Sequence, residues 1–534
     1  MIRVKNIKLR YKEDRGLILE RACKKLRLNI KNVKSWRIFK ESLDVRKKED
    51  IFYIYTVDVE ADNEEKIIKS AKSPDVVKAE YVEYVYPKGI FDFSQRPVIV
   101  GFGPAGMFAA LILSRMGARP LVLERGREAG QRLKDINKLM EKGELNKESN
   151  IQFGEGGAGT FSDGKLTTRI KDPRSLKVME EFVKHGAPEE ILYSHNPHIG
   201  TDRLVDVVKN IRREIIENGG EVRFESRVTD LIFENSQVKG IVVNGNEEIK
   251  CRSVVLCVGH SARDTFERLF ERGVSIEAKP FAVGCRIEHS QELINKAQYG
   301  SGEKAEYFGP AEYKLTYTAK NGRGVYTFCM CPGGYVVPAA SEEGMVCVNG
   351  MSYYARDGKF ANSALLVQVF PQDFENKGPL GGMYFQREIE KKAFEMGGGG
   401  YGAPAQYVGS FMGYKDFSPA ENMEGTYRPR VKQADLNKLF PEYITEAMRE
   451  AIEAMGRKVK GFNSAEALLI APECRSSSPV RILRDSLCQS VSVRGLFPAG
   501  EGAGYAGGIV SAAVDGIRAA EMVCESLKKE LGEF

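Results

Sequence analysis

PVIVGFGPAGMFAALILSRMGARPLVLER, residues 97–125, is the stretch that decides the fold of this 534-residue chain. Its apolar start, Val98–Val100, predicts a buried parallel strand, and the G-x-G-x-x-G pattern that follows opens an apolar helix closed by Gly117. A second apolar strand then ends on Glu124. These parts in this order predict a βαβ unit that binds a dinucleotide at the N-terminus of its helix.

The glycines and the acid of this unit each have a physical role. Gly101 lets the strand turn sharply, Gly103 leaves the backbone open to a pyrophosphate, and Gly106 allows close packing of helix on strand. Glu124 follows Gly101 by 23 residues, near the usual distance for the acid that binds ribose hydroxyls, and an acid here argues against the 2′-phosphate of NADP. The pattern fits NAD and FAD equally. The cofactor contacts expected here are Gly101, Gly103, Pro104, Ala105, Gly106, Glu124 and Arg125.

Composition and charge bound the class of protein. Hydrophobic residues make up 42% of the chain and charged residues 28%, which is ordinary for a water-soluble protein. No apolar run approaches the ~18 residues that cross a bilayer, and the first residues show no signal-peptide pattern. The ten cysteines have neither disulfide-framework nor zinc-site spacing. We therefore expect a cytoplasmic protein with no membrane contact and no metal site.

Residues 1–90 have the β-α-β-β-α-β order of the split ferredoxin-like pattern, with Val76–Val85 as the last strand. They carry 22 Lys and Arg against 15 Asp and Glu, so the basic excess of the whole chain lies here. This fold hosts many functions, RNA binding among them, and the segment shows no aromatic RNA-binding motif. A solvated turn explains the basic run 46–48 more simply than a nucleic-acid contact, which stays an alternative.

Two later segments are rich in glycine. FGEGGAGTFSDGK, residues 153–165, holds five glycines and lets backbone approach a flat or anionic ligand. AGEGAGYAGGI, residues 499–509, follows a strand and opens a helix with bare N–H groups. A flexible loop and a tightly packed helix are the structural alternatives. With the turn after strand 254–258, these segments are expected to add the cofactor contacts Gly156, Gly157, Thr160, Gly259, Gly500, Glu501, Gly507, Gly508 and Ile509. Val228, in the predicted strand 227–233, is a further expected contact.

The pattern changes at residue 276, where alternating strands and irregular glycine-rich pieces begin. We interpret residues 276–469 as a sheet-rich α+β domain inserted into a Rossmann-like domain. That Rossmann-like domain is then discontinuous, built from residues 97–275 and 470–534. The predicted fold class is α/β, with residues 1–90 as a small ferredoxin-like α+β domain in front.

The strand–GxGxxG–helix–strand–Glu unit, V-L-C-V-G at 255–259 and F-P-A-G-E at 497–501 resemble FAD flavoproteins of the glutathione-reductase type. More narrowly, FGEGGAGTFSDGKL, TFCMCPGGYVVPA, PECRSSSPVRI and FPAGEGAGYAGGI resemble a bacterial group of FAD-dependent dehydrogenases with no assigned substrate, over nearly the whole chain. The resemblance implies FAD, with the late Gly–acid pair on the ribityl chain. Glu501 stands where that superfamily usually has Asp, and a second G-x-G-x-x-G for NAD(P)H is missing.

Two cysteines and three cations are the candidates for chemistry. Cys329 and Cys331 fall in a predicted strand, which puts both side chains on one face about 7 Å apart. They are either a strained redox pair, with Cys331 facing the domain interface near the flavin, or packing residues. Lys165, Arg475 and Arg481 are candidate anion binders, although ion pairs explain such residues as well.

The resulting hypothesis is a FAD-dependent oxidoreductase, specifically a dehydrogenase that passes a hydride between a small-molecule substrate and the flavin. Its candidate catalytic residues are Cys331, Cys329 and Lys165, and NAD(P)H is a candidate electron donor. A flavin monooxygenase is the first alternative. The second is an RNA-binding or tRNA-modifying flavoprotein that uses the basic N-terminal domain.

Overall fold

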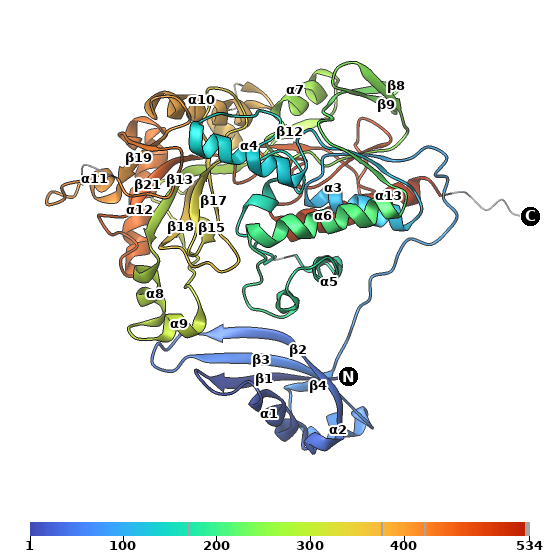
Figure 1. Cartoon of the computed structure of the whole chain (residues 1–534), viewed down its shortest axis with the longest axis vertical. Helices are drawn as coiled ribbons and strands as arrows, with labels where there is room; N and C mark the ends of the chain where they lie inside the picture. The colour runs from blue at the N-terminus through green and yellow to red at the C-terminus, as the bar shows by residue number, and fades with distance from the viewer. Residues whose placement is uncertain (169, 375–376, 421–422, 529–534) are drawn as a thin grey trace, which may run out of the picture.

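The computed structural model describes residues 1–168, 170–374, 377–420 and 423–528. It contains a small antiparallel sheet at the N-terminus, a five-stranded parallel sheet and a seven-stranded mixed sheet (Figure 1). The predicted α/β class with a parallel sheet is therefore confirmed. Within the described ranges, no helix is long and apolar enough to cross a membrane.

The N-terminal sheet has the strand order β2-β3-β1-β4, and all its neighbours are antiparallel. Its last strand, Val76–Lys78, is shorter than the predicted range Val76–Val85. The chain leaves the sheet there, so that the Tyr84 hydroxyl donates to Glu521 and the Tyr86 hydroxyl accepts from Arg115, both in the parallel-sheet domain. The elements are β1 (Ile2–Arg10), α1 (Leu17–Leu26), β2 (Val33–Asp44), β3 (Phe52–Ala61), α2 (Glu64–Ala71) and β4 (Val76–Lys78).

The parallel sheet has the order β23-β11-β5-β6-β7, and its three-residue central strands are fully buried. Two helices, α3 and α13, lie against each other on it, so close that a Cβ at Gly516 would stand 2.0 Å from the carbonyl oxygen of Ala105. A separate meander, β8 to β10, follows β7. The elements are β5 (Val98–Val100), α3 (Pro104–Arg115), β6 (Leu121–Leu123), α4 (Ala129–Lys142), α5 (Arg174–Lys184), α6 (Thr201–Glu217), β7 (Glu221–Arg223), β8 (Val228–Glu234), β9 (Gln237–Val243), β10 (Glu247–Lys250), β11 (Val254–Leu256), α7 (Arg263–Glu271), β23 (Leu496–Pro498) and α13 (Ile509–Ser526).

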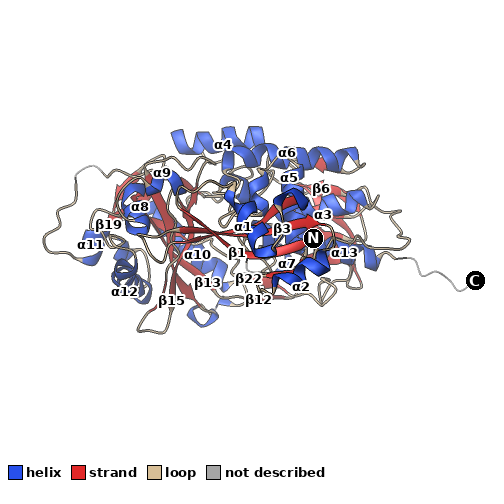
Figure 2. Ribbon diagram, turned by 90° about the horizontal axis from the view of Figure 1, so that it is seen from below, coloured by secondary structure: helices blue, strands red, loops and turns tan. Residues whose placement is uncertain are grey.

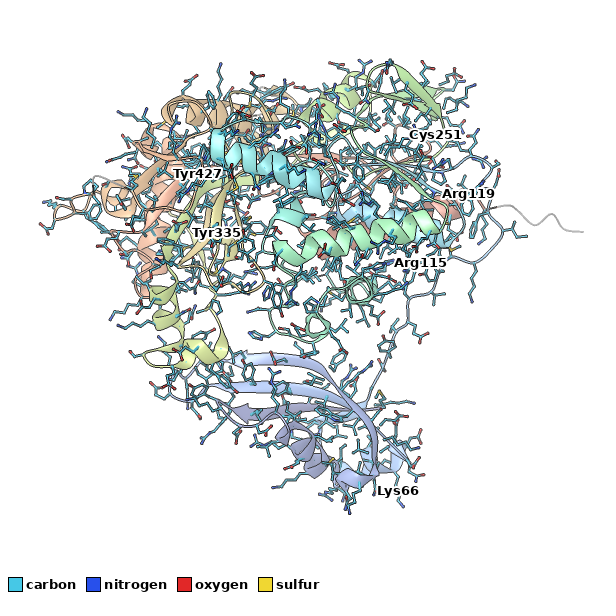
Figure 3. The ribbon with its side chains drawn as sticks, in the orientation of Figure 1. Lys66, Arg115, Arg119, Cys251, Tyr335 and Tyr427 are labelled. Carbon is cyan, nitrogen blue, oxygen red and sulfur yellow. The ribbon has the colours of Figure 1, made fainter. Side chains whose placement is uncertain are left out.

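Arg115, labelled in Figure 3, joins three helices of this domain. Its guanidinium donates to Glu181 on α5 at 2.5 and 2.7 Å and to Glu214 on α6 at 2.6 Å. His185 lies between the same two carboxylates. With two lysines also paired to these acids, the cluster is an ion-pair network that fixes α5 and α6 to the end of α3.

The seven-stranded sheet has the order β14-β15-β18-β13-β21-β19-β20, antiparallel except between β19 and β20. It continues to Glu473, past residue 469 where the sequence pattern placed the end of the insertion. Two short sheets, β12-β22 and β16-β17, accompany it. The elements between residues 276 and 482 are β12 (Ile276–Ala278), β13 (Phe281–Ser290), α8 (Gln291–Tyr299), α9 (Lys304–Phe308), β14 (Thr316–Thr318), β15 (Gly324–Cys331), β16 (Tyr335–Pro338), β17 (Val348–Met351), β18 (Phe360–Val369), α10 (Gly381–Met396), β19 (Ala403–Tyr407), α11 (Val408–Met412), β20 (Val431–Gln433), α12 (Glu442–Lys458), β21 (Leu468–Glu473) and β22 (Val480–Ile482).

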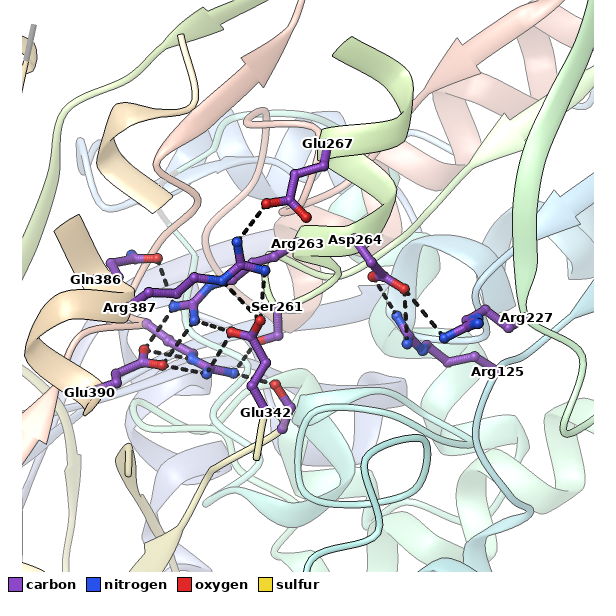
Figure 4. A network of polar contacts seen from close by, with 12 residues as sticks. Arg125, Arg227, Ser261, Arg263, Asp264, Glu267, Glu342, Gln386, Arg387 and Glu390 are labelled. Carbon is purple, nitrogen blue, oxygen red and sulfur yellow. Dashed lines mark hydrogen bonds and ion pairs between the residues drawn. The ribbon is translucent and has the colours of Figure 1, made fainter. Parts of the chain in front are cut away.

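Figures 1 and 2 show the two large sheets side by side, with α3, α6 and α13 at one end of the molecule and α11 and α12 at the other. A buried ion-pair network joins them (Figure 4). Glu390 of α10, fully buried, accepts from Arg263 at 2.8 and 2.9 Å and from Arg475 at 2.6 and 2.8 Å. Arg263 opens α7 of the parallel-sheet domain, so this carboxylate ties the two domains together.

The N-terminal domain touches the rest of the chain through aromatic side chains. Tyr53 of β3 lies 5.6 Å, ring centre to ring centre, from Phe308, and Tyr11 lies 4.8 Å from Tyr307, both partners in α9. Glu41 of β2 pairs with His195 of the parallel-sheet domain at 3.2 Å.

Candidate cofactor and active site

Both predicted glycine-rich junctions open on one cavity of about 1580 Å³. The carboxyl ends of β5, β6, β11 and β23 form one wall, and β14 and β15 of the inserted sheet form the opposite wall. In open α/β sheets, ligands bind outside the carboxyl ends of the strands. The cavity therefore lies at the position where this fold places a cofactor, and it continues onto the inserted domain.

The three glycines of G-x-G-x-x-G meet three different surroundings. Gly101 has a φ of +95°, and a Cβ there would stand 2.6 Å from the carbonyl oxygen of Cys257. A Cβ at Gly106 would lie 2.0 Å from the carbonyl oxygen of Gly101. At Gly103 the nearest atom to a Cβ is the Cα of Gly157, at 3.7 Å, and the φ is −78°. Gly101 and Gly106 are thus required by the fold, whereas Gly103 faces open space in the cavity.

Two helices begin at the cavity without a capping side chain. The N-cap of α3 is Gly103 and that of α13 is Gly508, and neither helix has a side-chain hydrogen bond at its N-cap. Gly507 and Gly508 are exposed, with no atom nearer than 4.0 Å to an added Cβ. The first N–H groups and the positive dipole ends of both helices therefore face the same space, which suits an anionic ligand.

Glu124, at the end of β6, holds three backbone amides. Its Oε2 accepts from the N–H of Phe102 at 2.8 Å, and its Oε1 accepts from Gly126 and Gly154 at 2.9 Å each. The carboxylate lines the cavity and is 5% exposed. It consequently joins the turn after β5 to the glycine-rich loop and keeps unused acceptor capacity on Oε2 for a ligand hydroxyl.

Arg132 of α4 organises the glycine-rich loop, a role that the sequence did not reveal. The guanidinium is fully buried and donates to the carbonyls of Asn150, Ile151 and Glu155 at 2.7–2.8 Å. Burial lowers the pKa of Arg132 to about 10, so the side chain stays charged at neutral pH. The loop then passes between the starts of α3 and α13, where a Cβ at Gly159 would lie 3.1 Å from Ile509.

Glu501 and His260 meet at the carboxyl ends of the neighbouring strands β23 and β11. The Nδ1 of His260 lies 3.1 Å from Oε1 of Glu501, and both residues line the cavity. Within the described residues the buried Nε2 of His260 has no hydrogen-bond partner. Gly500, by contrast, lies behind the wall, where its N–H donates to Asp515 at 2.8 Å.

The opposite wall carries a charged cluster. Lys165 pairs with Glu312 at 3.1 Å, and Arg356 pairs with Glu312 at 2.7 Å and with Asp163 at 2.9 Å. Burial disfavours the charge of Lys165, but Glu312 and Asp163 outweigh burial and raise its pKa. Lys165 is therefore a fixed cation at the edge of the cavity.

The two cysteines are not placed as an alternating strand would place them. Cys329 lines the cavity, whereas Cys331 is fully buried and lies behind the wall. The expectation that Cys331 faces the domain interface is therefore wrong; a bulge in β15 turns Cys329 to the cavity instead.

The two candidate anion binders of the C-terminal part are also engaged. Arg475 lines the cavity, but its guanidinium already donates hydrogen bonds to Glu390, Ser261 and Ser341. Arg481 pairs with Glu277 at 3.4 Å and is absent from the cavity lining.

The cavity thus gathers most of the predicted site residues. Those behind its wall are Gly106, Gly156, Thr160, Gly500 and Cys331, which serve the packing of the surrounding backbone. Those on the wall are Gly101, Gly103, Pro104, Ala105, Glu124, Arg125, Gly157, Lys165, Val228, Gly259, Cys329, Glu501, Gly507, Gly508 and Ile509.

Comparison with known proteins identifies the family. Residues 280–476 match the family described as "FAD-dependent protein, C-terminal domain-like", and residues 1–60 match a domain of unknown function (DUF8436). A Clostridium beijerinckii protein with the name "Uncharacterized protein" is 48% identical over 526 residues, 98% of either chain. The chain belongs to the family of this clostridial protein, and its residues 280–476 match the C-terminal domain of FAD-dependent proteins.

More distant similarities cover parts of the chain. A thiamine thiazole synthase of Aeropyrum pernix is 28% identical over 211 residues, 37% of this chain and 65% of that one. Among solved structures, a flavoprotein/dehydrogenase from Cytophaga hutchinsonii aligns with a TM-score of 0.38 and 13% identity, over 82% of this chain and 80% of that one. Similarity this weak transfers no activity.

Proposed function

We propose that the chain is a FAD-dependent dehydrogenase that passes a hydride between a small-molecule substrate and the flavin. The observation that carries the proposal is the pair of uncapped helix starts at Gly103 and Gly508, which open on one cavity. The free space at Gly103 fits a pyrophosphate, since a side chain there would fill it.

The residues on the cavity wall fit the parts of FAD. The start of α3 would bind the pyrophosphate, and Glu124 would accept a hydrogen bond from a ribose hydroxyl with its remaining Oε2 acceptor capacity. The positive end of α13 would stabilise negative charge that develops at the far end of the cofactor. FAD itself would supply hydride acceptance and donation, which no side chain supplies.

The substrate would bind between the cofactor and the inserted sheet. More basic than acidic side chains line the cavity, which favours an anionic substrate beyond the phosphates of FAD. The basic set is Arg125, Lys165, Arg227, Lys279, Lys314, Lys458 and Arg475, and the acidic set is Glu124, Glu312, Glu473 and Glu501.

Anaerobic reduction of the purified holoprotein tests the reaction type. Bleaching of the flavin by NADH or NADPH would identify the pyridine nucleotide as donor, and bleaching by an organic anion alone would identify a substrate. Slow reoxidation of the reduced protein by oxygen supports the dehydrogenase. Fast reoxidation coupled to substrate hydroxylation would favour the monooxygenase instead.

One observation favours a second candidate function, contact with nucleic acid through the N-terminal domain. The sheet face away from α1 and α2 exposes basic and aromatic side chains together, and Phe39 is 38% exposed there, with the Arg3 guanidinium 3.3 Å from its ring centre. Basic grooves with stacking aromatics bind single strands. The exposed set is Lys8, Arg10, Arg37, Phe39 and Lys40. Salt-dependent binding of a single-stranded oligonucleotide by the full chain, lost in Phe39→Ala, tests this candidate.

A further inference from the structure

The strand β15 carries a distortion at the point where it lines the cavity. It pairs with β18 in regular register up to Phe328 opposite Ala364, but the next pair is Cys331 opposite Asn362. One extra residue is therefore inserted into β15, which is a β-bulge. Cys329, inside the bulge, has a φ of +42°, a conformation that glycine favours and that costs a side-chain residue free energy.

The bulge brings two thiols together. In a regular strand, residues two apart lie about 7 Å from each other, too far for their thiols to touch. Here the Cys331 thiol donates to the carbonyl oxygen of Cys329 at 3.3 Å, and the two side chains are close enough that each shifts the pKa of the other. The strained backbone thus brings the two thiols nearer to each other than a regular strand would.

The buried guanidinium of Arg286 contacts this thiol pair. Arg286 of β13, fully buried, donates to the Cys329 carbonyl at 2.6 Å and to the Cys331 sulfur at 3.5 Å, and it pairs with Glu473 at 3.0 Å. The hydrogen bond from Cys331, followed by the charges of Arg286 and Lys165, lowers the pKa of Cys329 to about 6. The same coupling raises the pKa of Cys331.

All ten cysteines lie in the described part of the chain, and Cys329 differs from the other nine. It is the one that is not buried and the one whose pKa is lowered. Burial raises the pKa of Cys251 and of Cys524 to about 12, which keeps these thiols protonated and unreactive. The bulge therefore holds a half-buried thiol of lowered pKa at the cavity next to a fully buried thiol of raised pKa.

We propose that Cys329 and Cys331 are a redox-active dithiol at the cavity, in which Cys329 attacks a disulfide and Cys331 resolves the product. The Cys329 thiolate attacks one sulfur of a small disulfide, so the substrate S–S bond breaks and one thiolate leaves. The Cys331 sulfur then attacks Cys329, forms the Cys329–Cys331 bond and releases the second thiolate, which takes the Cys331 proton. The dithiol is oxidised by two electrons and the small disulfide is reduced by two.

The first test treats the purified full chain with 2-hydroxyethyl disulfide, a small neutral disulfide, and needs no flavin. The parent protein should lose about 2 Da and show a Cys329–Cys331 linkage in peptide mapping. Cys331→Ser should stop at a stable mercaptoethanol adduct on Cys329, and Cys329→Ser should give no adduct on Cys331. Cys347→Ser, a change of a buried cysteine in the same domain, is the control and should react like the parent.

Alkylation by iodoacetamide supplies a second readout. At pH 6.5 the parent should be alkylated at Cys329, and Cys331→Ala should slow that reaction roughly 10-fold because the thiolate loses its hydrogen-bond donor. No linkage and no adduct with the disulfide, or alkylation of Cys329 only above pH 8 in the parent, would overturn the proposal.

A third experiment requires bound FAD and so rests on the proposed function, whereas the first two experiments do not. In a FAD-loaded protein whose thiols have been oxidised, anaerobic dithionite titration should consume about two electrons more per chain than in Cys329→Ser. If the first test gives the Cys329–Cys331 disulfide but this titration consumes no additional electrons, the dithiol is redox-active and does not exchange electrons with the flavin. A chain without bound flavin leaves the first two tests intact.

Discussion

The two walls of the cavity are built by different means. At its two glycine-rich junctions the wall from the parallel sheet presents main chain, with helix starts at Gly103 and Gly508 and a carboxylate, Glu124, that is occupied by main-chain amides. The wall from the inserted sheet presents side chains, with Cys329 as its reactive group and Glu312 as the partner of Lys165, which comes from the glycine-rich loop. The first wall can hold a cofactor that many proteins share, whereas the second can discriminate between substrates. Variants of each wall should therefore fail in different ways.

Breaking the junction between the walls should have the largest effect. Glu390→Ala leaves the buried guanidinium groups of Arg263 and Arg475 without their shared carboxylate. Removing one partner of a buried ion pair costs about 3–5 kcal/mol, and we expect a loss of this size in the free energy of unfolding. Urea denaturation followed by circular dichroism measures it.

Glu388→Ala is the matched control on the same helix. Its carboxylate is 65% exposed and, among the residues that the structure describes, pairs only with Lys377, so this change should cost less than about 1 kcal/mol. Equal losses in the two variants would show that Glu390 does not join the domains.

The buried carboxylate of Glu390 also predicts how the stability of the protein depends on pH. Although burial opposes ionisation, Arg263 and Arg475 lower the pKa of Glu390 to about 2 from an ordinary value of 4.5. A lowered pKa contributes stability that is fully present above the unfolded value and is lost as the pH falls through the folded one. The melting temperature of the parent should therefore fall between pH 4.5 and 2, and that of Glu390→Gln should fall less steeply. Parallel curves for the two proteins would contradict this assignment.

Two glycines of one motif should separate folding from binding. Gly103→Val places a side chain in the cavity without a clash in the protein, so the chain should fold and lose FAD affinity by about 100-fold or more, equivalent to about 2.7 kcal/mol. Gly106→Val meets a carbonyl oxygen at 2.0 Å and should impair folding itself. Circular dichroism and FAD fluorescence titration distinguish the two outcomes. Full FAD affinity in folded Gly103→Val would place the cofactor elsewhere.

Glu124 should give a smaller loss on the same wall. Glu124→Ala is expected to weaken FAD binding by roughly 1–3 kcal/mol, because buried N–H groups and a ribose hydroxyl lose their acceptor. The thermal stability should fall as well, since three backbone amides depend on this side chain. Unchanged affinity with lowered stability would limit Glu124 to the structural role.

The smallest effect should come from Lys165, which reaches from the glycine-rich loop to Glu312 at the opposite wall. Lys165→Met removes a cation that contributes less to the thiolate of Cys329 than the Cys331 hydrogen bond does. The alkylation midpoint of Cys329 should rise, but by less than in Cys331→Ala, and FAD affinity should stay unchanged. A loss of FAD in Lys165→Met would mean that the two walls are not functionally separate.

The contrast between the walls also explains what the sequence could predict. The roles of Gly101, Gly103 and Gly106 follow from a local pattern, because the turn, the open approach and the packing all arise within a few residues. The parallel sheet could be predicted for the same reason. The wall of the cavity that the parallel sheet forms could therefore be predicted from the sequence alone.

The other wall depends on distant residues and on local strain. Arg286 reaches Glu473, 187 residues away, and no short pattern signals that pair. Alternation placed Cys329 and Cys331 on one face, and the bulge in β15 overrode it. Arg132 and Arg475 have isolated positions in the sequence, so their burial on carbonyls and carboxylates could not be read from spacing.

The most direct test of the account is the cofactor content of the parent protein. Visible absorption and extraction of the purified full chain should show FAD, and apoprotein should take up about one FAD per chain, because one cavity holds both glycine-rich junctions. A colourless protein that takes up no added FAD would contradict the central claim.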